Sequence, residues 1–118
     1  MSAENNVLKG RKSEDSCCRY LLDRGYTVLE RNYRSDRGEI DVIALKSDIL
    51  SFIEVKTLPP LWELDSLVYK INKRKQSKIR HTAESYVVNN TRDIKYNEIS
   101  FDVFVVQGTA QFFFNGVF

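Results

Sequence analysis

Residues 38–57 read GEIDVIALKSDILSFIEVKT, and the pattern of this segment determines the predicted fold. Its β-branched and aliphatic residues form two runs, separated by Ser47-Asp48, a pair typical of a tight turn. A two-residue turn fixes the register of the hairpin, because residues equidistant from the turn face each other. The register then predicts two opposed pairs, Asp41 with Glu54 and Glu39 with Lys56.

The predicted hairpin gathers these three acids and one lysine on a single face, because strand side chains alternate between faces. Asp41 opposite Glu54 is a like-charge pair, which destabilises a hairpin unless a cation lies close by. Ile43 and Leu45 continue the same face, and we expect Ile40, Val42 and Ala44 to share the other one. Both faces are therefore predicted to be partly buried.

Carboxylates on a partly buried hairpin are tolerable mainly where a cation binds them. Oxygen ligands select Mg²⁺ or Mn²⁺, which are bound by few protein groups and several waters. Lys56 beside such an ion could orient or deprotonate an attacking water, or stabilise charge on a phosphate. The alternative is a surface hairpin with cross-strand ion pairs, which contribute little to stability.

Patterns on either side of the hairpin predict the remaining elements. Apolar residues at helical spacing indicate a helix over residues 14–24, which Gly25 ends as a left-handed cap. A longer helix is predicted over residues 65–89, with a break near Asn72. Strands are predicted over residues 26–33, 39–45, 49–56, 98–106 and 111–115. The fold class is α/β, a small mixed β-sheet flanked by two helices in the order α-β-β-β-α-β-β.

Length and composition indicate one domain over residues 1–118, with residues 1–9 as a flexible N-terminus. No apolar run approaches the roughly 20 residues that span a bilayer, so we expect no membrane partner. The two cysteines, Cys17 and Cys18, are adjacent, which excludes a disulfide scaffold and favours a cytoplasmic location. No small-molecule cofactor is expected.

The net charge of +2 conceals an uneven distribution. Residues 70–81 carry six Lys and Arg and no acid, which leaves twelve basic against sixteen acidic residues elsewhere. Such asymmetry favours a polyanion partner, although a charge run is also compatible with a solvated helix face. The row of Lys70, Arg74 and Lys78 is suited to a nucleic-acid backbone.

Two further charged residues interrupt apolar helical stripes. Glu14 is in line with Cys18 and Leu21, so it either points at the hairpin acids or gains from the helix dipole in the first turn. Lys75 is in line with Ile71 and Ile79. It either extends its amine to solvent or contacts a phosphate beside the acids.

An ordered set of motifs resembles the restriction-endonuclease-like, PD-(D/E)XK superfamily. More specifically, the chain resembles the small bacterial YraN-like proteins of uncharacterised protein family 0102, which are similar to archaeal Holliday-junction resolvases. The motifs follow one another along the chain: GRKSED at 10–15, RYL at 19–21, GY at 25–26, LERNYR at 29–34, GEID at 38–41, FIEVKT at 52–57, Lys75, Ala83 and FDV at 101–103.

The resemblance implies a restriction-endonuclease-like core and a single nuclease-like domain that hydrolyses DNA phosphodiester bonds with Mg²⁺ or Mn²⁺. It implies that Asp41 and Glu54 are metal ligands, joined by the carbonyl of Val55. It also implies that Lys56 is the catalytic lysine and Glu14 an accessory acid. With the charge distribution, it gives the following expected roles: Lys75, Lys70, Arg74, Lys78 and Arg34 as nucleic-acid contacts, and Glu39 as an accessory residue.

Two departures from the family pattern bear on substrate binding. Ser13 stands where the family usually has glycine, and Leu58-Pro59-Pro60 replaces the usual arginine after the lysine strand.

The leading hypothesis is a nuclease for DNA, branched or structured substrates included. Two rivals stay open: a catalytically silent nucleic-acid-binding module or accessory subunit of a DNA-processing partner, and a structural protein whose patch is only cross-strand pairing. The aromatic strand near Phe113 would support a homodimer.

Overall fold

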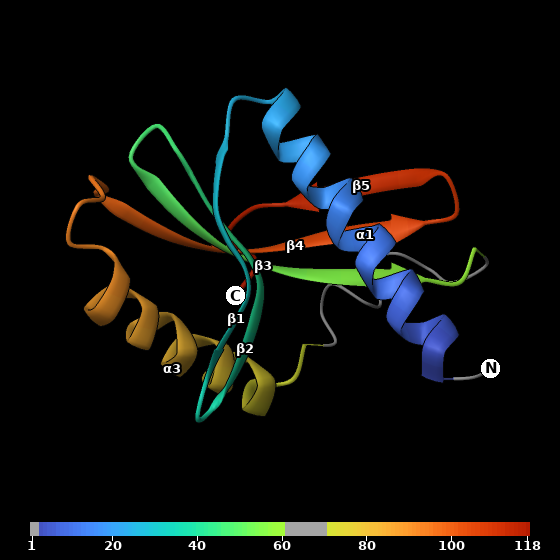
Figure 1. The fold of residues 1–118 in the computed structure, drawn as a ribbon, viewed down its shortest axis with the longest axis horizontal. Coiled ribbons are helices and arrows are strands. Elements are labelled where there is room, and N and C mark those ends of the chain that lie inside the picture. The colour runs from blue at the N-terminus through green and yellow to red at the C-terminus, as the bar shows by residue number, and fades with distance from the viewer. Residues whose placement is uncertain (1–2, 61–70) are drawn as a thin grey trace.

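The computed structural model describes residues 3–60 and 71–118, which form two helices and five strands (Figure 1). In chain order these are α1 (Ala3–Asp23), β1 (Thr27–Ser35), β2 (Gly38–Lys46), β3 (Ile49–Leu58), α3 (Lys73–Asn90), β4 (Glu98–Gln107) and β5 (Ala110–Phe114). The predicted order α-β-β-β-α-β-β is confirmed, and the predicted strand ends differ from these by at most two residues.

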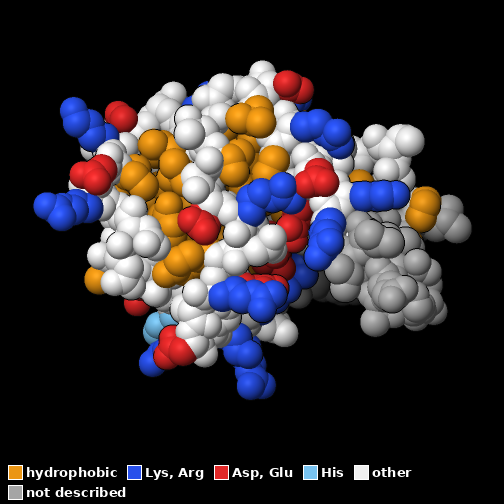
Figure 2. Space-filling model, in the orientation of Figure 1, with side chains coloured by type: hydrophobic (Ala, Val, Ile, Leu, Met, Phe, Trp, Pro, Cys, Tyr) orange, Lys and Arg blue, Asp and Glu red, His pale blue; other side chains and the backbone are white. Residues whose placement is uncertain are grey.

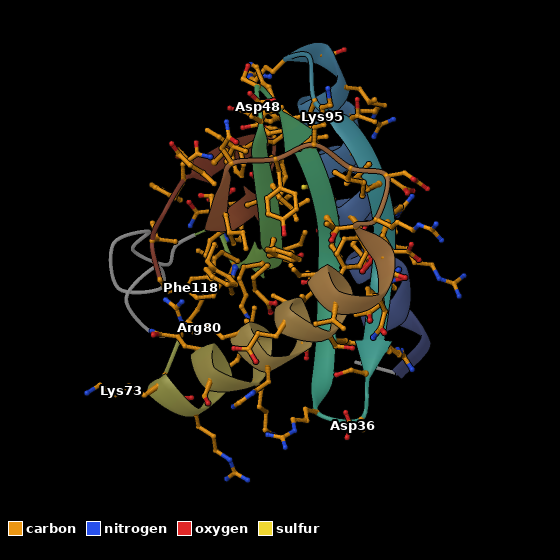
Figure 3. The ribbon with its side chains drawn as sticks, turned by 90° about the vertical axis from the view of Figure 1, so that its left-hand side faces the viewer. Asp36, Asp48, Lys73, Arg80, Lys95 and Phe118 are labelled. Carbon is orange, nitrogen blue, oxygen red and sulfur yellow. The ribbon has the colours of Figure 1, made fainter. Side chains whose placement is uncertain are left out.

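The five strands form one mixed sheet in the order β1-β2-β3-β4-β5. β3 and β4 are parallel and every other neighbouring pair is antiparallel. A parallel pair needs a crossover connection, and here the crossover contains α3. Figure 3 shows α3 in front of the sheet and α1 behind it, so each helix covers one face.

Both helices depart from the predicted bounds at their N-terminal ends. α1 begins at Ala3, eleven residues before the predicted start at residue 14, and a flexible N-terminus over residues 1–9 stays a prediction. This segment contains the helix-favouring residues Ala, Glu, Leu and Lys, and an existing helix extends at little cost. α3 begins after Asn72, whose side chain accepts a hydrogen bond of 2.8 Å from the backbone N–H of Lys75. Ile71 and Asn72 are not helical, in agreement with the predicted break, and the predicted helical part at residues 65–70 lies outside the described residues.

The C-terminal end of α1 is the predicted glycine cap. Gly25 has φ of 84°, a backbone conformation that glycine adopts without steric cost. Gly25 N–H bonds to the carbonyl of Leu22, and Tyr26 N–H to that of Leu21, as in a Schellman motif. This cap turns the chain from α1 directly into β1.

Each sheet face has its own apolar core. The α1 side is built from Cys17, Cys18, Leu21, Val42, Ala44, Ile53 and Phe104. The α3 side is built from Ile40, Ile43, Leu50, Phe52, Ile79, Ala83 and Tyr86. The prediction that both faces of the hairpin are buried is confirmed, but Ile40 is on the α3 side and does not share a face with Val42 and Ala44.

The change of face at Ile40 follows from a local distortion of β1 and β2. Asn32 has φ of 53°, a left-handed conformation that Asn tolerates better than most residues. On one side of it Arg31 bonds to Asp15 of α1, and on the other Tyr33 stacks edge-on against Tyr86 of α3. Two residues that would share a face in a regular strand therefore face opposite helices, and the paired strand β2 makes the same change at Asp41.

The turn at Ser47-Asp48 has the predicted two-residue form, with φ of 50° and 67°. The predicted register is confirmed, because Lys46 pairs with Ile49 and Val42 with Ile53. Pairing ends at Val42 and Ile53, so Asp41 and Glu54 are the first residues beyond the paired part of this hairpin.

A buried acid, Asp102, binds the C-terminal segment to the sheet. Asp102 on β4 is fully buried, and its Oδ1 accepts hydrogen bonds from the Gly116 N–H and the Ser100 hydroxyl. Phe113 on β5 packs edge-on against Tyr20 and Tyr26, so this aromatic strand contributes to the core. A homodimer through β5 stays a prediction. Neither helix of the described chain is long and apolar enough to cross a membrane.

Candidate functional site

Asp41 lies where β2 and β3 separate. Beyond the last paired residues, the backbone N–H of Val55 donates a hydrogen bond of 2.8 Å to the Asp41 Oδ2. The carboxylate thus takes the place of a backbone carbonyl in the ladder, which satisfies a donor that the separation would leave unpaired. This bond fixes the orientation of the Asp41 side chain beside Glu54.

The two carboxylates oppose each other electrostatically. Burial, followed by the charge of Glu54, raises the pKa of Asp41 to about 7, although the bond from Val55 acts in the opposite direction. Glu54 is itself only 8% exposed. The like-charge pair predicted from the hairpin register is therefore present, in surroundings that disfavour two ionised acids.

Two lysines from different elements converge on one oxygen of this pair. Lys75 Nζ, from α3, is 2.7 Å from Glu54 Oε1, and Lys56 Nζ, from β3, is 3.2 Å from the same atom. α3 packs closely against β2 at Gly38, because a Cβ at this glycine would be 3.3 Å from the Thr82 hydroxyl of α3. Glu54 and Lys56 share a face, as the alternation of β3 predicts.

The two lysines respond differently to the same surroundings. Burial lowers the pKa of Lys56, and the neighbouring Lys75 ammonium adds to this effect. Burial also acts to lower the pKa of Lys75, but the bond to Glu54 reverses the balance and raises it. Lys56 is thus the lysine that gives up a proton more readily.

Glu14 joins the acids from α1. Its Oε2 accepts a hydrogen bond of 3.0 Å from the Asn32 side-chain amide and is 3.9 Å from Arg31 Nη2. The Glu14 charge also contributes to the raised pKa of Asp41. The contacts of Glu14 are with Asn32 and Arg31, and its role as an accessory acid stays a prediction.

Glu39 and Arg34 form a separate pair at the rim. Arg34 Nε is 3.1 Å from Glu39 Oε2, and the two side chains are 77% and 51% exposed. The expected pairing of Glu39 with Lys56 is wrong, because β2 and β3 are no longer paired there and Lys56 turns to Glu54. Glu39 still adds a little to the raised pKa of Asp41.

Basic side chains surround the acids. Arg74 and Lys78 are exposed on α3, one turn apart, while Lys70 lies outside the described residues. Figure 2 shows acidic side chains near the centre of one face, between the positions of α1 and α3 in Figure 1, with Lys and Arg around them. His81 is exposed and 3.7 Å from Glu84, apart from the hairpin acids.

Two residues that contribute to the site, Asn32 and Ser13, were not predicted from the sequence to do so. Asn32 holds Glu14 and carries the distortion of β1, and the signal for it is an Asn within a run of strand-favouring residues. The Ser13 hydroxyl is 2.5 Å from that of Thr57, which ties α1 to β3 next to Lys56. Ser13, a departure from the family pattern, therefore has a structural role that glycine could not fill.

The residues present fit a divalent cation bound by few protein groups. The charge of Glu54 raises the pKa of Asp41 and Glu54 is buried, so a cation between the two carboxylates would relieve their repulsion. Within residues 3–60 and 71–118, no three Asp, Glu, His or Cys side chains converge closely enough to enclose a metal. A pair of carboxylates would suit an ion that keeps several waters, such as Mg²⁺, and would not form a closed structural metal site.

Comparisons with known proteins agree with the motifs. The model of uncharacterised protein family UPF0102 matches residues 13–106. A UPF0102 protein of Dictyoglomus turgidum is 43% identical over 99 residues, covering 84% of this chain and 81% of its own. One of Treponema denticola is 44% identical over 107 residues, covering 83% and 79%. One of Campylobacter concisus is 44% identical over 90 residues, covering 75% and 77%. The chain therefore belongs to the uncharacterised, YraN-like protein family UPF0102.

Proposed function

We propose that this protein is a metal-dependent endonuclease that hydrolyses DNA phosphodiester bonds, branched or structured DNA included. The observation that carries the proposal is the convergence of Asp41, Glu54 and Lys56 at the point where β2 and β3 separate. Two adjacent carboxylates can hold a divalent cation, and a lysine beside them can orient or deprotonate the attacking water of metal-assisted phosphodiester hydrolysis.

Asp41, Glu54 and the carbonyl of Val55 would hold Mg²⁺ or Mn²⁺, and Glu14 would act as an accessory acid at the rim. The bound ion would supply positive charge that polarises the phosphate and acidifies water. Lys56 would orient the attacking water or accept its proton, a role that its lowered pKa favours. Its position on the strand of Glu54 keeps the amine close to that carboxylate.

The nucleic acid would be bound by the basic face of α3. Arg74 and Lys78 are exposed, and neither forms an ion pair with an acid among the described residues. Phosphate contacts of this kind position the backbone without reading sequence. Lys70 and Arg34 are proposed as additional contacts, and Arg34 would exchange its ion pair with Glu39 for a phosphate.

A cleavage assay tests this function. Mg²⁺ should support cleavage of branched or linear DNA by the wild type, and Asp41→Ala should abolish it while the circular dichroism spectrum is retained. Asp36→Ala, a change to an exposed turn carboxylate, is the matched control and should leave cleavage unchanged. Cleavage that persists in Asp41→Ala would refute the assignment of the site.

One observation favours a second candidate, a silent DNA-binding module or accessory subunit of a DNA-processing partner. Lys56 and Lys75 already neutralise Glu54 without a metal. A module of this kind would bind DNA with strong salt dependence and would bind no divalent cation. Calorimetric titration with Mg²⁺ therefore separates the two candidates.

A further inference from the structure

Two ammonium groups share one oxygen of Glu54, which is more than orientation of that side chain requires. Lys75 Nζ is 2.7 Å and Lys56 Nζ is 3.2 Å from Oε1. A carboxylate oxygen has about two lone-pair positions for hydrogen bonds. The side of Glu54 that carries Oε1 is therefore already occupied by positive charge.

The two lysines already place positive charge beside Glu54 when no metal is bound. Asp41 and Glu54 contribute two formal negative charges, and Lys56 and Lys75 contribute two positive ones. A divalent cation between the acids would leave the same four groups with a surplus of two positive charges. Repulsion would then act on both lysines, and the one with the freer path to solvent would move away.

Lys75 is the lysine that can move away. Its side chain is 42% exposed against 29% for Lys56, and it comes from α3, across the site from Glu54. Lys56 is two residues from Glu54 on the same strand, so its backbone keeps it beside the acid. Lys75 is also within one turn of Arg74 and Lys78, whose exposed groups form the basic face of α3.

We propose that Lys75 is an internal counter-ion of Glu54 that a divalent cation displaces, so that metal binding frees its ammonium for a phosphate of the substrate. This inference rests on the proposed metal site and adds a coupling between metal and substrate. Because coupling between two ligands is reciprocal, phosphate bound by the freed Lys75 would in turn strengthen metal binding. Lys75 would therefore contact Glu54 in the metal-free state and a substrate phosphate in the metal-bound state.

A metal titration of the full chain without nucleic acid tests the inference. Lys75→Met removes the competing cation and should tighten Mg²⁺ binding by about tenfold relative to the wild type, measured by calorimetry. Lys73→Met removes the same charge from the same helix. Figure 3 shows Lys73 at the start of α3, pointing away from the sheet, and it forms no ion pair with another described residue. This control should change the affinity by less than about twofold.

Equal or weaker Mg²⁺ binding by Lys75→Met would overturn the inference and leave the proposed metal site standing. Absence of Mg²⁺ binding in every variant would overturn both. A second measurement needs no variant: in ¹⁵N-lysine-labelled wild type, the Lys75 ammonium should give a resonance that shifts or is lost when Mg²⁺ saturates the protein. An unchanged resonance at saturation would overturn the displacement.

Discussion

The Asp41 carboxylate accepts a hydrogen bond of 2.8 Å from the backbone N–H of Val55, just beyond the last paired residues of β2 and β3. One oxygen thereby replaces a ladder partner. The bond fixes the acid that the proposed function needs and also closes the end of the hairpin. The structural and the chemical role of Asp41 can be separated only by a substitution that keeps its hydrogen-bond acceptor and removes its negative charge.

Asp41→Asn should change the pH dependence of stability. The folded pKa of Asp41 is about 7 against an ordinary value of 3.8. The stability contributed by its proton is thus fully present below pH 3.8 and is lost as the pH rises through 7. An amide cannot ionise but still accepts from Val55. Without metal, the variant should be more stable than the wild type by roughly 1–3 kcal/mol at pH 8.5.

Urea unfolding at pH 4 and pH 8.5 measures this difference. The two proteins should have nearly equal free energies of unfolding at pH 4, because the wild-type acid is then largely protonated in the folded state. Asp36→Asn, in the exposed turn between β1 and β2, serves as the control and should follow the wild type. A variant that is less stable than the wild type at pH 8.5 would show that the charge of Asp41 stabilises the fold.

Mg²⁺ should stabilise the folded protein at pH 8 and much less at pH 5.5. A ligand that binds only the folded state adds stability by mass action, and saturating Mg²⁺ should raise Tm by roughly 5 °C or more. At pH 5.5 Asp41 is mostly protonated, since its pKa is about 7, and a protonated acid binds a cation poorly. Calorimetric melting with NaCl of equal ionic strength as the control checks this, and an equal rise at both pH values would contradict it.

Arg74→Gln and Lys78→Gln should each weaken DNA binding without dependence on sequence. Each phosphate contact that is lost should reduce the slope of log affinity against log salt by about 1. Lys95→Gln makes the same change at the other end of the molecule from Lys73, beside Asp48 (Figure 3), and should leave the slope unchanged. Fluorescence anisotropy at several salt concentrations gives the slopes, and equal slopes for all variants would exclude the α3 face.

Asp102→Ala should destabilise the fold by roughly 2–4 kcal/mol, because it leaves the Gly116 N–H and the Ser100 hydroxyl without their buried acceptor. Asp102→Asn keeps an acceptor and should cost less. Asp93→Ala, in the exposed loop before β4, is the control. Urea unfolding ranks the three proteins, and an Asp102→Ala variant as stable as Asp93→Ala would show that this acid does not hold the C-terminal segment.

The hairpin was predictable because its determinants are local. Ser47-Asp48 set a two-residue turn, the turn set the register, and the register brought Asp41 next to Glu54. The cap at Gly25 and the start of α3 at Asn72 are local signals of the same kind. Family resemblance added roles for these residues, but the proximity of the acids follows from the turn alone.

The features that could not be predicted depend on contacts between distant elements. Regular alternation predicts that Ile40 and Val42 share a face, and it fails because Asn32, on another strand, adopts a left-handed conformation. Lys75 was expected to contact a phosphate or solvent. Its bond to Glu54 depends on how closely α3 packs against β2, which no local pattern encodes.

A crystal soaked in Mn²⁺ would show directly whether Asp41 and Glu54 bind a metal, because Mn²⁺ has an anomalous signal that Mg²⁺ lacks. The proposed function predicts an anomalous peak between the carboxylates of Asp41 and Glu54, within coordination distance of both, and its loss in Asp41→Ala crystals soaked in the same way. Saturating Mn²⁺ that leaves no peak between these two carboxylates would contradict the assignment of a metal site to this hairpin.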